Sequence, residues 1–348
     1  MRQRITTVGL DIARNLFQLH GLDEGGRAVL RRKLHRSELV GFFEQQPRCT
    51  VFLEACGAGH YWGRLLSGFG HEVKLIAPEA VRPFVKRGRK NDAAAALCVA
   101  GAWPETRFVP IKSVEQQAVL ALHAGGSPLV KQQTTVANAL RGLAGEFGVT
   151  VPRGLHKLEE LMALVGAGEG IPAAGRQAMA ELYAHGRAAA ERVAALEEQI
   201  VRHARQDATA RRLATIPGVG PITASLIAAT VGDHVGAFRS ARRFAAWLGL
   251  VPRQHSTGGR TRLGGITKAG NAEIRRLLVL GATSMVRRAT RWDSKAGLWV
   301  RGVPARRPVR LVTVALANKL ARIAWALMTR GEVYQAQGRA PAAAATAA

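Results

Sequence analysis

The chain has 348 residues, a length that suits two or three domains with buried cores. Lysine and arginine number 50 against 24 acidic residues, which gives a formal net charge of +26. A charge of this size indicates a polyanionic partner, and nucleic acid is the first choice. The sequence has no run of about 18 apolar residues, the length that a membrane-spanning helix needs.

The remaining composition argues for a reducing compartment. The three cysteines, Cys49, Cys56 and Cys98, include no Cys-x-x-Cys pair, so a zinc site or disulfide framework is not expected. Met1-Arg-Gln-Arg leads into a strand-like run and not into the apolar helix of a secretory signal. We therefore expect a cytoplasmic protein that binds a polyanion and no membrane.

The first third of the chain alternates strand and helix patterns. Short apolar or β-branched runs bounded by turn residues predict strands at residues 5–13, 16–20, 28–34, 50–55 and 72–77. Helices are expected from a Ser37 cap through Phe43, over residues 60–69, and from Asn91-Asp92 into an alanine-rich run. The resulting order, βββαβαβα, is that of a ribonuclease-H-like domain.

Three acids lie at the ends of these predicted elements. Asp11 and Glu54 close strands that would be neighbours in such a sheet, and Asp92 begins the last helix. Clustered carboxylates are the ligands that Mg²⁺ prefers, and an acid inside an apolar strand is costly unless it is paired or metal-bound. The alternatives are a turn for Asp11, a solvated strand end for Glu54 and a helix-terminus charge for Asp92.

The middle of the chain is predicted to be mostly helical. Periodicity over residues 114–147 predicts a helix, which Gly125-Gly-Ser-Pro128 should interrupt. Residues 173–205 are alanine-rich with helical spacing, which suits a coiled-coil dimer arm or equally a spacer packed against its own chain. Gly166–Gly175, which includes a proline, is the best candidate for a linker.

The last third carries most of the positive charge. Thr215-Ile-Pro-Gly218-Val-Gly220-Pro resembles the hairpin of a helix-hairpin-helix element, where glycine amides and a helix N-terminus receive a phosphate; an ordinary turn is the alternative. Between His234 and Gly331 there are 20 lysines or arginines and only two acids. Such one-sided charge favours contact with phosphates over a mixed solvated surface.

A glycine-rich basic stretch, residues 247–271, is the most distinctive part of the sequence. Ser256 and Thr257 stand directly before Gly258-Gly259, where a ligand can approach the backbone closely. Four cations suited to phosphate oxygens surround them, namely Arg253, Arg260, Arg262 and Lys268. A hydroxyl in such a loop can attack phosphorus if its proton is removed, and the alternative is a loop that only holds nucleic acid.

Together these patterns resemble DEDD-type insertion-sequence transposases, of insertion-sequence family 110 and its 1111 subgroup. The resemblance rests on Val8-Gly-Leu-Asp11, Phe52-Leu-Glu54-Ala-Cys-Gly, Lys90-Asn-Asp92-Ala, Ile216-Pro-Gly-Val-Gly-Pro-Ile-Thr and Trp247-Leu-Gly-Leu-Val-Pro-Arg-Gln-His-Ser256-Thr-Gly-Gly. It implies a RuvC-like domain over 1–112, a helical coiled-coil region over 113–210, a mostly α-helical serine-bearing transposase domain over 211–332 and a disordered tail over 333–348.

The resemblance also implies an activity and partners. Relatives of this kind are prokaryotic, nucleoid-associated recombinases, guided by a structured RNA that pairs with donor and target double-stranded DNA. A serine acts as nucleophile beside an acidic tetrad that holds Mg²⁺, which makes Asp11, Glu54 and Asp92 the first three tetrad acids. A homodimer or homotetramer would bring two DNA molecules together.

This chain departs from the family pattern at two places. Ala95 stands where the fourth acid is expected, one helical turn after Asp92. Thr257, and not a serine, directly precedes Gly258, so Ser256 is the expected nucleophile and Thr257 the alternate. The other functions to weigh are a metal nuclease of the Holliday-junction type and a non-catalytic remnant that only binds nucleic acid.

Overall fold

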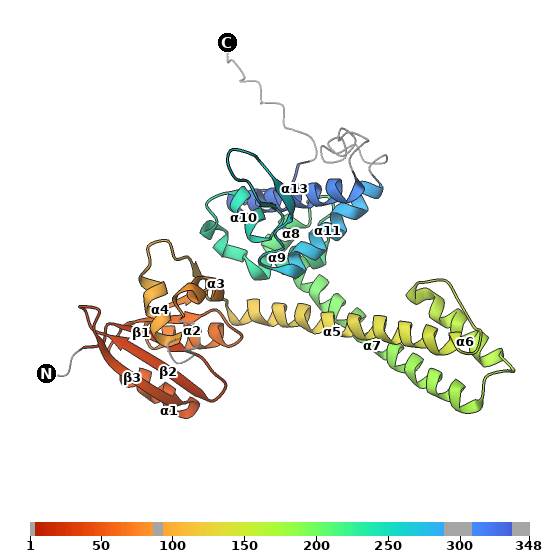
Figure 1. Cartoon of the computed structure of the whole chain (residues 1–348), viewed down its shortest axis with the longest axis horizontal. Helices are drawn as coiled ribbons and strands as arrows, with labels where there is room; N and C mark the ends of the chain where they lie inside the picture. The colour runs from red at the N-terminus through yellow and green to blue at the C-terminus, as the bar shows by residue number, and fades with distance from the viewer. Residues whose placement is uncertain (1–3, 86–92, 289–307, 336–348) are drawn as a thin grey trace, which may run out of the picture. The chain divides into compact units, whose positions relative to one another are not determined.

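A computed structural model describes residues 4–85, 93–288 and 308–335 (Figure 1). The chain divides into two compact units, Met1–Val114 and Glu115–Ala348. The first is mixed α/β and the second is mostly helical. Most of the tail expected over residues 333–348, together with the expected helix start at Asn91-Asp92, lies outside the described residues.

The first unit is built on a six-stranded sheet in the order β3-β2-β1-β4-β5-β6. The strands are β1 (Thr7–Asp11), β2 (Leu16–Leu22), β3 (Ala28–His35), β4 (Thr50–Glu54), β5 (Glu72–Ile76) and β6 (Phe108–Val109). β1 pairs with β4 and β4 with β5 in parallel, while the β1–β2, β2–β3 and β5–β6 pairs are antiparallel. The five strands predicted from sequence are confirmed, and β6 was not predicted.

Helices cover both faces of this sheet. On one face, alternate strand residues such as Leu10 and Leu53 are fully buried against α1 (Arg36–Gln45) and α2 (Gly59–Gly68). On the other face lies α4 (Ala93–Ala102), so close to β1 that a side chain on Gly9 would collide with the Ala94 carbonyl oxygen. Because side chains alternate along a strand, residues two positions from Gly9 also face α4.

Two details of the first unit differ from expectation. α1 begins at Arg36 with His35 as its N-cap residue, not at a Ser37 cap, because Glu38 Oε2 accepts a hydrogen bond from the His35 amide at 2.6 Å. A short helix, α3 (Pro78–Val81), and the turn η1 (Arg82–Phe84) follow β5 and were also not predicted.

The second unit starts with a helical arm. It contains α5 (Val114–Gly145), η3 (Leu155–Lys157), α6 (Leu158–Ala167) and α7 (Ala173–Gln206), which confirms the long helix expected over 173–205. These helices share a core that includes Leu140, Leu161 and Met179, so α7 packs against its own chain. Of the expected linker at Gly166–Gly175, residues 168–172 form the turn between α6 and α7, where Ile171 is buried in this core, and the flanking residues are helical.

The predicted helix break at Gly125-Gly-Ser-Pro128 is wrong, because α5 continues through it. Pro128 is exposed, and so is Ala124, whose carbonyl loses its helical partner; water can therefore satisfy that carbonyl. On the opposite side Gly125 lies beside Leu196 of α7. Packing between the two helices therefore outweighs the local cost of proline and glycine.

A helical globule completes the second unit. Its elements are α8 (Ala208–Leu213), α9 (Pro221–Thr230), η4 (Gly232–Ala237), α10 (Ala241–Trp247), β7 (Pro252–Gln254), β8 (Leu263–Ile266), α11 (Ala272–Arg287) and α13 (Val309–Arg330). Of the described helices, α13 is the one whose length and composition would allow it to cross a membrane. Its residues Leu316, Leu320 and Ala324 are instead fully buried in the core of the globule.

Candidate active site and nucleic-acid interface

The first candidate site is the edge of the sheet where β1 and β4 end. The parallel register pairs Leu10 with Leu53, so Asp11 and Glu54 follow as the next residues on adjacent strands. Both lie two positions after residues that face α4, namely Gly9 and Phe52. The two acids predicted to converge therefore sit side by side on the α4 face.

The electrostatics show that these carboxyl groups interact. Burial raises the pKa of Asp11 above its usual range. Burial also raises the pKa of Glu54, and repulsion from Asp11 and then from Glu79 raises it further. Among the described residues neither acid has a cationic partner or a hydrogen bond to its side chain. Two half-buried carboxyl groups that lack a neighbouring cation or hydrogen-bond donor are typical of a functional site and not of an interaction that stabilises the fold.

A hard divalent cation is the ligand that this chemistry fits. It would remove the repulsion between Asp11 and Glu54, and carboxylate oxygens are its preferred ligands. Asp92, the third predicted ligand, lies outside the described residues. Among the described residues, no three His, Cys, Asp or Glu side chains lie close enough together to hold a metal ion. Glu79, on α3 after β5, is an exposed third acid that the sequence analysis did not single out.

Ala95 lies on the same face of the sheet. It lines a cavity of about 320 Å³ together with Gln18 of β2 and with Arg31 and Lys33 of β3. Gln18 is the antiparallel partner of Asp11. The position at which the resemblance implies a fourth acid therefore lies beside β2, the neighbour of the strand that carries Asp11, and beside basic side chains.

The second candidate site is the hairpin formed by β7 and β8, called the serine hairpin here because Ser256 lies between the two strands. His255 N donates to Arg262 O at 2.8 Å, and Arg260 N donates to Thr257 O at 3.0 Å, which closes the tip. Gly258 and Gly259 have φ values of 56° and 75°, a left-handed conformation that suits glycine. The loop expected around Ser256 is thus an ordered, basic β-hairpin in a mostly helical unit.

Ser256 lies at the start of this tip and is exposed. Its hydroxyl oxygen accepts a hydrogen bond from the Arg262 amide at 3.1 Å. The neighbouring Thr257 is also exposed, as are the four predicted phosphate-binding cations Arg253, Arg260, Arg262 and Lys268. The structure therefore gathers the hydroxyls, the two glycines and the cations on one exposed hairpin.

The base of the hairpin is held by residues that the sequence analysis missed. Arg275 of α11 donates to the carbonyls of Leu248 at 3.0 Å and Ala269 at 2.6 Å. Asn318 of α13 donates to the carbonyl of Leu250 at 3.1 Å. These contacts span 27 and 68 residues of sequence for Leu248 and Leu250, so no local pattern could have revealed them.

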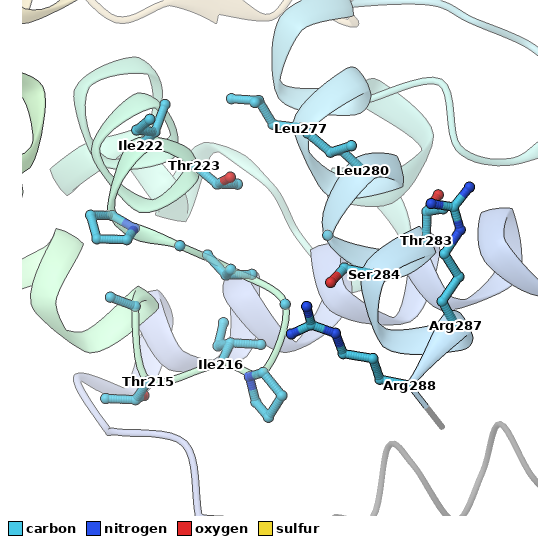
Figure 2. Close-up of a pocket in the computed structure, with 17 residues that line it drawn as sticks. Thr215, Ile216, Ile222, Thr223, Leu277, Leu280, Thr283, Ser284, Arg287 and Arg288 are labelled. Atoms are coloured by element: carbon cyan, nitrogen blue, oxygen red, sulfur yellow. The ribbon is translucent and has the colours of Figure 1, made fainter. Parts of the chain in front are cut away.

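The third candidate site is the turn between α8 and α9. Gly218 has a φ of 81°, and Val219 N donates to Ile216 O at 2.9 Å, which makes the expected tight hairpin. Gly220 is the N-cap residue of α9, and the first turn of that helix begins at Pro221. A groove with a volume of about 830 Å³ separates this hairpin from α11 (Figure 2).

Comparison with known proteins gives a consistent result. A model of the family described as "Transposase IS116/IS110/IS902 family" matches residues 210–297. The "Probable family 20 transposase" of Pseudomonas aeruginosa is 46% identical, over 95% of this chain and 99% of that protein. The "Transposase for insertion sequence element IS1328" of Yersinia enterocolitica is 39% identical, over 95% of this chain and 98% of that protein.

A further relative belongs to the subgroup that the sequence motifs indicate. The "Transposase for insertion sequence element IS1111A" of Coxiella burnetii is 38% identical, over 95% of this chain and 92% of that protein. Similarity at this level extends over nearly the whole chain. The chain therefore belongs to the IS116/IS110/IS902 family of transposases.

Proposed function

We propose that the chain is a DNA recombinase that moves an insertion sequence, with Ser256 as the nucleophile and Asp11, Glu54 and Asp92 as Mg²⁺ ligands. The observation that carries this proposal is the pair of carboxyls at the ends of β1 and β4, whose pKa values are raised. The strand order β3-β2-β1-β4-β5 supports a ribonuclease-H-like, RuvC-like role for the first unit. Membership of the transposase family supports the reaction.

The serine step is a transesterification. Ser256 Oγ would attack a phosphorus atom of DNA and form an Oγ–P ester, while the bond from phosphorus to one strand oxygen breaks. The proton that Ser256 loses balances the proton that the departing strand oxygen gains. The cations of the hairpin would neutralise the phosphate and orient it at Ser256, with Gly258 and Gly259 allowing close approach.

The acidic edge, formed by Asp11 and Glu54 at the ends of β1 and β4, would contribute through its negative charge. Mg²⁺, when bound, would stabilise negative charge on phosphodiester oxygens. Asp11 and Glu54 would place that ion at the end of the parallel strands, and Glu79 would add to the negative field there. Because Ala95 supplies no carboxylate, the edge would hold its ion with fewer protein ligands than a complete tetrad.

The proposed partners are a structured guide RNA and two double-stranded DNA molecules, donor and target. The excess of 20 basic over two acidic residues between His234 and Gly331 supports binding of several nucleic-acid segments. The glycine hairpin at Gly218 and Gly220 would contribute phosphate contacts that do not depend on sequence. Assembly as a homodimer or homotetramer in the cytoplasm, on the nucleoid, completes the proposal.

A covalent-trapping experiment tests the serine. Purified protein is incubated with guide RNA, Mg²⁺ and labelled donor DNA, quenched with detergent and resolved on a denaturing gel. We expect protein-linked DNA with the wild type and with Thr257→Ala, and none with Ser256→Ala, which should still bind DNA. Adducts that persist in Ser256→Ala and disappear in Thr257→Ala would assign the nucleophile to Thr257.

Because Ala95 supplies no carboxylate, two other functions must be tested beside the recombinase. A metal nuclease of the Holliday-junction type would give hydrolysed DNA ends with no adduct and no dependence on Ser256. A non-catalytic remnant would bind nucleic acid, strongly and with salt sensitivity, and cut nothing. The same gel separates all three functions.

A further inference from the structure

The groove between the α8–α9 hairpin and α11 is preformed. A side chain on Gly281 of α11 would collide with the carbonyl oxygen of Gly218, and one on Gly218 would lie 2.6 Å from Met285 Sδ. The two elements therefore pack backbone to backbone at the inner end of the groove. Its width is set by that contact and does not depend on a ligand.

One wall of the groove offers unsatisfied hydrogen-bond donors. Gly220 provides no side-chain cap for α9, so the amides of Ile222 and Thr223 in its first turn lack intrahelical partners. Thr223 is only 6% exposed, and its hydroxyl has no hydrogen-bond partner among the described residues. Figure 2 shows its side chain on the side of α9 that faces α11. Thr223 lines the groove, and a hydroxyl without a protein partner on an otherwise buried side chain, beside a helix N-terminus, points to an anionic ligand.

The opposite wall supplies positive charge. Ser284 and Arg287 of α11, and Arg288 directly after this helix, line the groove and are exposed. Neither arginine forms an ion pair with a described residue. In Figure 2 the Arg288 guanidinium extends toward the hairpin. Arginine and hydroxyl donors that face a helix N-terminus across a gap form a phosphate-binding arrangement.

The rest of the lining is apolar, and this narrows the class of ligand. Ile216, Ile222, Leu277 and Leu280 line the groove, and Leu280 is 59% exposed although it is a large apolar side chain. A phosphate alone would leave this surface in water, whereas a base or sugar would cover it. A duplex keeps its base faces stacked inside, while an unpaired strand can present them.

We propose that this groove binds an unpaired polynucleotide strand, with a phosphate between Thr223 and Arg288 and the adjoining base or sugar against Leu280. The inference rests on the proposed function in assuming that the enzyme handles nucleic acid, and it adds the form of nucleic acid that this site takes. Unpaired DNA and unpaired RNA share the required chemistry.

Equilibrium binding by full-length protein tests the groove. Fluorescence anisotropy is measured with three labelled 12-mers of one sequence: single-stranded DNA, single-stranded RNA and duplex DNA. We expect Arg288→Ala and Leu280→Ala each to weaken binding of one or both single strands about tenfold. Leu280→Ala should leave duplex affinity unchanged, and the more affected single strand identifies the source. Thr223→Val, which keeps the side-chain shape, should weaken single-strand binding in the same way.

Matched substitutions control for charge and for exposed apolar area. Arg192→Ala removes one exposed cation from α7, and Leu164→Ala removes one exposed leucine from α6. Equal losses in Arg192→Ala and Arg288→Ala, or equal losses of duplex and single-strand affinity in Leu280→Ala, would overturn the inference. A change in sedimentation of Leu280→Ala without a change in binding would also overturn it and would assign the groove to contact between copies.

The proposed function can fail separately. If the wild type forms Ser256–DNA adducts while the groove variants bind every oligonucleotide normally, only the groove inference is wrong. If the wild type forms no adduct and cuts nothing, yet Leu280→Ala loses only single-strand affinity, the groove inference holds and the recombinase proposal fails.

Discussion

At the scale of single residues, the acidic edge is the place where the proposed metal binding would act against the stability of the fold. Asp11 and Glu54 sit half-buried beside one another with their pKa values raised, so at neutral pH their ionised forms lower the stability of the first unit. The penalty fades as the pH falls and the folded state takes up protons. Carboxyl groups that stabilise the fold would instead have lowered pKa values, and the protein would lose stability as the pH falls.

Glu54→Gln should therefore raise the thermal midpoint of the first unit at pH 7, since it removes a half-buried charge and its repulsion from Asp11. The gain should vanish near pH 4, where ordinary carboxyls protonate. Added Mg²⁺ should raise the midpoint of the wild type more than that of Glu54→Gln. Calorimetry checks both results, with the exposed Glu24→Gln as control; a lower midpoint at pH 7 would contradict our interpretation of the edge.

Ala95→Asp should raise recombination and tighten its Mg²⁺ dependence, because it returns a carboxylate to the α4 face beside the strand of Asp11. Recombination is measured at a series of Mg²⁺ concentrations. Val99→Asp adds the same charge one turn further along α4 at an exposed position and should have no effect. An unchanged Mg²⁺ requirement in Ala95→Asp would argue against a tetrad position here; an ion pair with Arg31 or Lys33 would be the competing fate of the new acid.

At the scale of elements, a glycine-to-alanine substitution should have opposite effects on stability in two helices, because one glycine is closely packed and the other is not. Gly281→Ala in α11 should destabilise the second unit by about 1–3 kcal/mol, because the new methyl group meets the Gly218 carbonyl. Gly142→Ala in α5 meets nothing within 4 Å and should stabilise it by about 0.5–1 kcal/mol. Urea denaturation gives both values, and similar effects of the two substitutions would contradict the packing described.

Pro128 provides a second test on α5. Pro128→Ala restores a backbone donor at an exposed position in the middle of a continuous helix, so we expect stabilisation of about 1–3 kcal/mol. Ser127→Ala, also exposed, should change stability by less than about 0.5 kcal/mol. Loss of stability in Pro128→Ala would mean that the proline serves a packing role that the structure does not show.

Local patterns predicted what depends on neighbours in sequence. The strands, the long helix α7, and the tight glycine turn at Gly218 each follow from periodicity or turn chemistry. The failures came from distant contacts: α5 continues past Pro128 because it packs on α7, and the serine hairpin is anchored by Arg275 and Asn318 from other helices. Glu79 was missed for the same reason, since only the fold brings α3 near Glu54.

At the scale of the whole molecule, charge should dominate binding. With a net charge of +26, much of the affinity for nucleic acid should come from displaced counterions. We expect the logarithm of the binding constant to fall linearly with the logarithm of salt concentration, by about 10³-fold or more between 50 and 200 mM salt for six or more phosphate contacts. Anisotropy titrations across this range measure the slope, and a flat profile would refute a charge-driven interface.

The serine hairpin has a consequence for when the enzyme can react. Ser256 is exposed, and the one hydrogen bond described for its hydroxyl comes from a backbone amide, so no described side chain is in place to withdraw its proton. Such a hydroxyl is a poor attacker on its own. If Ser256 is the nucleophile, as we propose, it should react only after the protein has assembled with nucleic acid, and the free protein should not nick the host chromosome.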